Sequence, residues 1–344
     1  MRLSNAGTII SAAIKHNIAL AEAGKARDSE YVVPMLWGAP GLGKTTKVQD
    51  ETDALGIDLR VWILAQYDAG ELGGFPMVVD GPQGKTMRKC RPADLPLEGT
   101  GVLFLDEFPQ APLANQNVAA QLLQERRIGE HRLGDGWTIV CAGNDIKHRA
   151  GTNQMPSHVK GRMIHLEIEA DTNDALDYFN SKQFRPELTG YIRYRPEYLH
   201  KFDADAKASP TPRNWERVNS VLGWGLDEVS EQYAIAGAVG APAAADFSGW
   251  LQIVREIPDP DQPFKAPMIA EVPNDPAILY ALMASLAARV DGKTIKNLML
   301  YLERVPNQEF VVVCMKDALK RNPALAKHAN VTAWLRGAGA GLII

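Results

Sequence analysis

Little in this 344-residue sequence suggests a cysteine metal centre, a membrane segment or a nucleic-acid-binding surface. Its three cysteines, Cys90, Cys141 and Cys314, lie far apart and lack the paired spacing of a zinc site, so we expect reduced thiols. No apolar stretch approaches the roughly 20 residues that a membrane-spanning helix needs. The net charge is −4 and there is no long basic run, so a nucleic-acid partner is not expected.

The N-terminal segment, residues 1–30, is predicted to be a helix followed by a linker. Lys15 interrupts its apolar residues before a secretory core is complete, so we expect a cytoplasmic protein. Ile10, Ile14 and Ile18 recur at helical spacing, which indicates one apolar face. An amphipathic helix is therefore expected to lead into the first domain.

Residues 31–170 alternate short apolar runs with helical patterns, which is typical of a parallel α/β sheet. The expected strands are Val32–Trp37, Val61–Leu64, Val102–Leu105, Thr138–Ala142 and Met163–Ile168. Turn residues around Asp80-Gly81-Pro82-Gln83-Gly84 predict a hairpin over Phe75–Cys90. A second hairpin is expected around Gly134-Asp135-Gly136.

From residue 171 the strand pattern fades and helical periodicity continues to the end of the chain. Thr211 and Pro212 favour a helix that starts near Arg213, because Thr can cap it and Pro suits its first turn. Residues 257–276 are rich in proline and are predicted to form an extended linker. We therefore divide this part into a helical region, 171–256, and a linker with further helices, 257–344.

The strongest motif follows the first expected strand. The sequence Gly-Ala-Pro-Gly-Leu-Gly-Lys-Thr matches the P-loop, whose glycines let backbone N–H groups turn inward around a phosphate. Lys44 would reach the β- and γ-phosphates, and the Thr45 hydroxyl would ligate Mg²⁺. A glycine-rich turn without function is the alternative for the loop alone. The residues expected to hold ATP are Gly38, Ala39, Pro40, Gly41, Leu42, Gly43, Lys44, Thr45, Thr46 and Asp106.

A second motif lies at the end of the third strand, where Val102–Leu105 runs into Asp106 and Glu107. Asp106 is predicted to hold Mg²⁺ through the water shell of the ion, and Glu107 to orient and polarise the attacking water. On its own such a pair most often marks a strand that meets solvent. In a chain with a P-loop, it favours hydrolysis of ATP over phosphoryl transfer to a small molecule.

With these two motifs placed, the chain resembles the AAA+ ATPases and, within them, the MoxR-like group. The resemblance implies a P-loop parallel sheet flanked by helices, then a helical lid and a C-terminal helical region. Ile139–Asn144 resembles the strand that carries the sensor-1 asparagine, so Asn144 would touch the γ-phosphate or the attacking water. A buried strand with an Asn in the following turn is the alternative for this pattern.

The resemblance also implies that two arginines contact the nucleotide. Met155–Met163 resembles the arginine-finger segment with Arg162 at the matching position, although Gly161 and Met163 depart from the family pattern and Arg149 lies nearby. The stretch around Pro212 resembles the start of a lid helix, which makes Arg213 the candidate sensor-2 contact to the γ-phosphate. A solvated surface charge is the alternative for each arginine.

The same resemblance implies a ring, in most members a hexamer, that remodels a protein client, often together with a von Willebrand factor A domain protein. The hairpin over Phe75–Cys90 lies where this group carries an insertion that acts at the ring's pore or on the substrate; a surface hairpin without a role is the alternative. Two other functions stay open. One is a motor that depends on nucleic acid, and the other is a scaffold that binds ATP with little turnover.

Overall fold

The computed structural model describes residues 1–26, 30–144, 153 and 155–337. The chain divides into two compact units, residues 1–169 and residues 170–344, and each is considered by itself. In the part of the chain that is described, no helix is long and apolar enough to cross a membrane.

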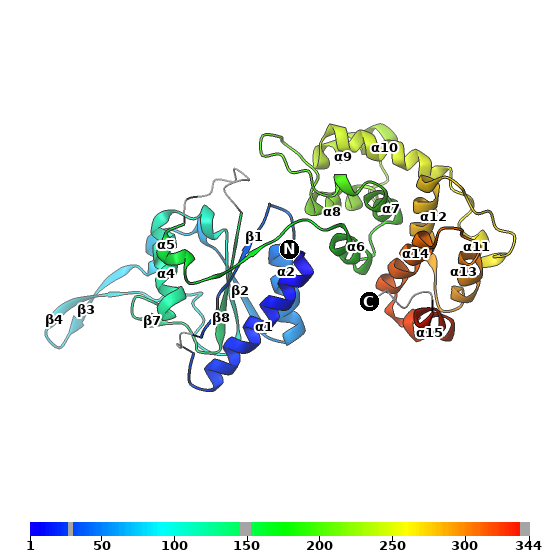
Figure 1. Ribbon diagram of the computed structural model, residues 1–344. Helices are drawn as coiled ribbons and strands as arrows, with labels where there is room; N and C mark the ends of the chain where they lie inside the picture. The colour runs from blue at the N-terminus through cyan, green and yellow to red at the C-terminus, as the bar shows by residue number, and fades with distance from the viewer. Residues whose placement is uncertain (27–29, 145–152, 154, 338–344) are drawn as a thin grey trace. The chain divides into compact units, whose positions relative to one another are not determined.

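The first unit is built on a five-stranded parallel sheet (Figure 1). The order across the sheet is β2-β5-β8-β1-β9, so β8 lies between the strand that precedes the P-loop and the strand that ends in the acidic pair. The strands are β1 Pro34–Trp37, β2 Asp58–Ile63, β5 Gly101–Asp106, β8 Trp137–Gly143 and β9 Ile164–Glu167. All five predicted strands are confirmed.

Successive residues of β5 enter two different apolar layers, one on each face of the sheet. Val102 and Phe104 pack with the N-terminal helix, whereas Leu103 and Leu105 pack with the helix that follows the acidic pair. Side chains of a strand alternate between faces, and a sheet covered on both faces therefore needs an unbroken apolar run. This is why β5 and β8 are apolar nearly throughout.

Helices cover both faces of this sheet (Figure 1). The helices of the unit are α1 Leu3–Glu22, α2 Lys44–Leu55, α3 Ala69–Gly73, α4 Leu113–Glu125 and α5 Ser157–Lys160, with 3-10 turns η1 Leu64–Gln66 and η2 Phe108–Gln110. Helix α1 buries Ile10 and Ile14 completely, which confirms the predicted amphipathic face. It packs into the first unit as part of its core.

Two small hairpins extend from the first unit. The predicted hairpin is confirmed as β3 Pro76–Gly81 paired with β4 Gly84–Lys89, and it projects from the unit (Figure 1). The second prediction was wrong in position. The hairpin is β6 Arg127–Ile128 with β7 His131–Arg132, and Gly134–Gly136 forms only the turn before β8. The Gly129 turn, at φ 57°, was the signal that sequence reasoning missed.

The second unit is helical, as predicted. Its helices are α6 Thr172–Ser181, α7 Pro186–Tyr194, α8 Pro212–Val221, α9 Glu228–Val239, α10 Ala241–Arg255, α11 Gln262–Lys265, α12 Pro276–Arg289, α13 Ile295–Leu302, α14 Gln308–Arg321 and α15 Ala329–Arg336, with 3-10 turns η4 Pro196–Tyr198 and η5 Pro323–Lys327. Helix α12 joins two apolar cores, because Ala281 packs in one and Leu282 in the other.

The proline-rich segment 257–276 differs from the predicted extended linker. It contains the short helix α11, and Ala270 is only 4% exposed within the core of the last helices. The Arg304 guanidinium donates to the carbonyl oxygens of Pro267 and Ala270, at 2.6 and 2.7 Å. The segment is therefore packed, because an arginine satisfies carbonyls that proline-rich backbone leaves without amide partners.

Candidate functional site

The P-loop leaves the carboxyl end of β1 and enters α2 at Lys44. Gly41 and Gly43 have φ values of 80° and 86°, a region that side chains disfavour, so glycine is required at both positions. Gly38 serves close approach, because an added Cβ would lie 3.0 Å from the carbonyl oxygen of Ile168 on the neighbouring strand's end. The first turn of α2 carries no acidic residue. Its unpaired N–H groups and positive dipole end favour an anion there.

Lys44 lies across the loop. It is only 8% exposed, and its ammonium donates to the carbonyl oxygens of Gly38 at 2.8 Å and Ala39 at 3.0 Å. It also donates to Asn144 Oδ1 at 3.1 Å. The predicted P-loop lysine and the predicted sensor asparagine are therefore in direct contact, although 100 residues separate them in the chain.

Thr45 and Asp106 are the second pair that the fold brings together. The Thr45 hydroxyl donates to Asp106 Oδ2 at 2.8 Å, across the 61 residues between the two motifs. Hydroxyl and carboxylate oxygens are the hard ligands that Mg²⁺ prefers. The two predicted metal ligands lie close enough to share one ion.

Glu107 directly follows β5 in a left-handed conformation, with φ 53° and ψ 36°. A non-glycine residue rarely adopts this region, and such strain is concentrated at functional sites. Its backbone N–H donates to Asp106 Oδ1 at 2.8 Å. The side chain is exposed at the edge of the sheet, where it is accessible to a reacting molecule.

Gln110 is a residue that the sequence analysis missed. In the orientation of its amide that pairs donors with acceptors, Nε2 donates to the Glu107 carbonyl oxygen at 3.3 Å. Its Oε1 accepts from the Asn144 backbone N–H at 3.0 Å and from Asn144 Nδ2 at 2.8 Å. No motif marks Gln110 in the sequence, because it meets Asn144 only through the packing of the turn after β5 against the end of β8.

Cys141 on β8 lies close to the site in sequence but takes no part in it. The residue is fully buried, and burial raises the pKa of its thiol well above the usual range. A protonated buried thiol is a poor nucleophile. Cys141 therefore serves the apolar layer beneath the site.

Arg162 lies near the amino-terminal ends of the sheet strands, whereas the P-loop lies at their carboxyl ends. It precedes Ile164, which pairs with Pro34 at the amino end of β1, whereas the P-loop follows the carboxyl end of β1. Four strand residues span roughly 13 Å. The structure does not bring Arg162 to the phosphate loop of its own chain.

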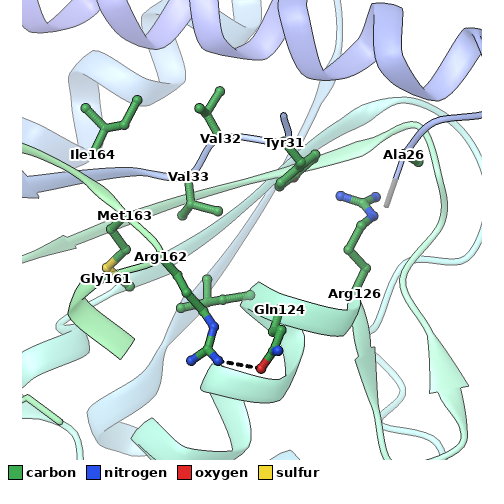
Figure 2. Close-up of a pocket in the computed structure, with 11 residues that line it drawn as sticks. Ala26, Tyr31, Val32, Val33, Gln124, Arg126, Gly161, Arg162, Met163 and Ile164 are labelled. Carbon is green, nitrogen blue, oxygen red and sulfur yellow. Dashed lines mark hydrogen bonds between the residues drawn. The ribbon is translucent and has the colours of Figure 1, made fainter. Parts of the chain in front are cut away.

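Around Arg162 there is a cavity of about 390 Å³ (Figure 2). The Arg162 guanidinium donates to Gln124 Oε1 at 2.6 Å and to the His158 carbonyl oxygen. On the far side, Arg126 is 2% exposed and stacks over the Tyr31 ring at 4.7 Å. Arg162 is thus held at the surface by short contacts from α4 and α5.

Arg213 and Arg149 are the two predicted positions that remain. Arg213 is exposed in the first turn of α8, in the second unit. The Thr211 hydroxyl accepts from the Asn214 N–H at 3.2 Å, which confirms the predicted cap. Arg149, the alternative finger, lies outside the described residues.

Comparisons with known proteins give similarity to solved structures only. No protein-family model and no curated protein matches the chain. RuvB from Thermotoga maritima, in a mutant form, is 20% identical with a TM-score of 0.37, covering 86% of this chain and 88% of that one. A second structure from the same organism, described as the RuvB Holliday junction branch migration motor, is 20% identical with a TM-score of 0.34. The match covers 85% of this chain and 86% of that one. NtrX from Brucella abortus is 16% identical with a TM-score of 0.38, and the match covers 88% of this chain and 61% of that one.

At these values the similarities carry no argument about function. The fold class follows from the chain itself: a parallel sheet with a P-loop after β1, helices on both faces and a helical region after it. The predicted fold class is confirmed.

Proposed function

We propose that the chain is a Mg²⁺-dependent ATPase whose site lies at the carboxyl edge of the sheet. One observation carries the proposal. Lys44, Thr45, Asp106 and Asn144 come from three separate strand ends, and direct hydrogen bonds link them in two pairs, Lys44 with Asn144 and Thr45 with Asp106. Ligands in open parallel α/β sheets bind at this edge.

Each residue has a role that its surroundings support. Lys44 binds and orients the β- and γ-phosphates, and the backbone N–H groups of the loop contact their oxygens. Thr45 and Asp106 would hold Mg²⁺, which neutralises charge on the phosphate oxygens when bound. Glu107 accepts a proton from the attacking water, and Asn144 orients that water or the γ-phosphate.

The proposal is tested by phosphate release from ATP with the Lys44→Ala protein. This variant should lose ATP binding and turnover, because the removed ammonium balances the phosphate charge. Lys47→Ala is the matched control, since Lys47 lies on the same helix but pairs with Glu51 at 2.8 Å. Turnover that survives in Lys44→Ala at the level of the control would refute the site.

For the assembly, we propose a ring in which Arg162 of one chain serves the nucleotide of its neighbour. The position of Arg162 supports this, since it is held at the surface on the edge remote from its own P-loop. A hexamer that acts on a protein client is the form that the MoxR-like resemblance implies. Arg213 is proposed as a contact to the γ-phosphate.

A further inference from the structure

Gln110 occupies the end of η2, the turn that begins directly after Glu107. Its amide bridges two residues of the proposed site: it donates to the Glu107 carbonyl oxygen at 3.3 Å and accepts from Asn144 through both the backbone N–H and Nδ2. The Glu107 backbone is held on both sides: its N–H donates to Asp106 Oδ1 at 2.8 Å, and its carbonyl oxygen also accepts from the backbone N–H groups of Gln110 and Ala111, each at 3.1 Å. This arrangement fixes the backbone from which the Glu107 carboxylate projects.

The same contact sets the orientation of the Asn144 amide. Lys44 donates to Oδ1 at 3.1 Å, and Nδ2 donates to Gln110 Oε1 at 2.8 Å. A half-turn of the Asn144 amide would point its NH₂ group at the Lys44 ammonium and its oxygen at the Gln110 oxygen. Both contacts would then be repulsive, so Lys44 and Gln110 together select one orientation.

The backbone is shaped for this contact at Gly143. A Cβ added there would lie 2.1 Å from Pro109 Cδ and, in the amide orientation described above, 3.2 Å from Gln110 Nε2. A glycine at the end of β8 therefore lets η2 rest directly on that strand end. Its use here is close approach, since Gly143 is not among the residues with positive φ.

From these contacts we infer that Gln110 is a positioning residue that couples Glu107 to Asn144. The inference rests on the proposed ATPase function. The Gln110 side chain links the fixed Glu107 backbone to Asn144, so its loss should let the Asn144 amide move independently of Glu107. Turnover depends on their joint alignment, whereas ATP binding depends on Lys44 and the loop. The effect should therefore fall on kcat and spare KM.

The experiment uses Gln110→Met, which keeps the length of the side chain and removes its hydrogen bonds. We expect kcat to fall about tenfold, the scale of one or two lost hydrogen bonds, with KM changed less than about twofold. Gln121→Met is the matched control. The Gln121 side chain accepts a hydrogen bond from the Gly129 N–H at 3.1 Å and takes no part in the site. The control should keep the rate of the unaltered protein.

A double-mutant cycle separates positioning from a merely structural role. If Gln110 acts through Asn144, then Gln110→Met in an Asn144→Ala background should lower kcat less than about twofold, because coupled residues are non-additive. Single-turnover experiments allow the hydrolysis rate of the slow variants to be measured. If the methionine variant does not fold, Gln110→Ala tests the same expectation.

Three results would overturn the inference. They are an unchanged kcat in Gln110→Met, the same fold-loss with and without Asn144, and an equal loss in the Gln121→Met control. Any of these leaves the proposed ATPase intact so long as the unaltered protein hydrolyses ATP. An unaltered protein that neither binds nor hydrolyses ATP would refute the proposed function, and the inference with it.

Discussion

At the scale of single residues, the contact between Thr45 and Asp106 decides how the site would hold its metal. A hydroxyl and a carboxylate oxygen 2.8 Å apart can both turn toward one ion with little movement. Thr45 lies in the first turn of α2 and Asp106 is the last residue of β5, so the fold fixes their separation. Rigid elements hold such ligands more closely than loops do.

Thr45→Val should therefore weaken the response to Mg²⁺. The variant keeps the shape of the side chain and removes the metal ligand, so we expect half-maximal phosphate release to need about tenfold more Mg²⁺. Thr52→Val is the control, since the Thr52 hydroxyl donates to the Gln49 carbonyl oxygen within the same helix. An unchanged Mg²⁺ titration in Thr45→Val would exclude Thr45 as a ligand.

At the scale of elements, the hairpin β3–β4 contrasts with the sheet from which it projects. Both of its strands are largely exposed, including Val78 at 69% and Met87 at 73%. Its two ends are adjacent, because the Cys90 N–H donates to the Phe75 carbonyl oxygen at 2.8 Å. The core of the first unit therefore does not depend on the hairpin.

Replacing Met77–Arg88 by an Asn-Gly turn should leave the fold intact. Such a turn joins antiparallel strands directly, and Pro76 and Lys89 are already partners. We expect the melting temperature to change by less than about 3 °C, because surface changes usually cost little. Leu103→Ala, in the buried strand β5, should instead cost about 2–5 kcal/mol. A fall in the free energy of unfolding as large as that of Leu103→Ala, on shortening the hairpin, would show that the hairpin supports the core.

The elements also show how far the sequence alone could lead. Apolar runs predicted all five sheet strands, and the runs are longest in β5 and β8 because a strand covered on both faces must be apolar. The P-loop and acidic-pair motifs, together with the family resemblance that marked Asn144, singled out residues that the fold places in contact. These residues meet because parallel strands have their carboxyl ends on the same side of the sheet.

Other features depend on tertiary packing that no local pattern encodes. Gln110 meets Asn144 only because η2 rests on Gly143. The proline-rich segment packs because Arg304, more than thirty residues later, satisfies its carbonyl groups. The second hairpin was misplaced because Gly134–Gly136 has the composition of a hairpin turn but precedes a buried strand.

At the scale of the whole molecule, a single chain has its proposed water-polarising residue and its proposed finger at opposite edges of one sheet. Glu107 follows the carboxyl end of β5, and Arg162 precedes the amino end of β9. If Arg162 acts on phosphate, it must act on the nucleotide of another chain. An arginine finger contributes roughly 10³–10⁵ in rate where one has been measured.

Mixing two inactive variants tests this arrangement. Arg162→Ala and Glu107→Gln should each hydrolyse ATP poorly, but a mixed ring contains interfaces where an intact Glu107 meets an intact Arg162. Activity should recover in part and be greatest near equal proportions. Differently tagged subunits must first show that mixed rings form. Mixed rings that stay as slow as either variant alone would remove Arg162 from the site.

The most direct test of the proposed ATPase is to separate binding from turnover at Glu107. Glu107→Gln keeps the size of the side chain, but its amide is a much weaker acceptor for the proton of water. ATP affinity, measured by fluorescence titration, should stay within about threefold of the unaltered protein, while phosphate release should fall at least about a hundredfold. Phosphate release by Glu107→Gln at the unaltered rate, or a loss of ATP affinity as large as that of Lys44→Ala, would contradict the account.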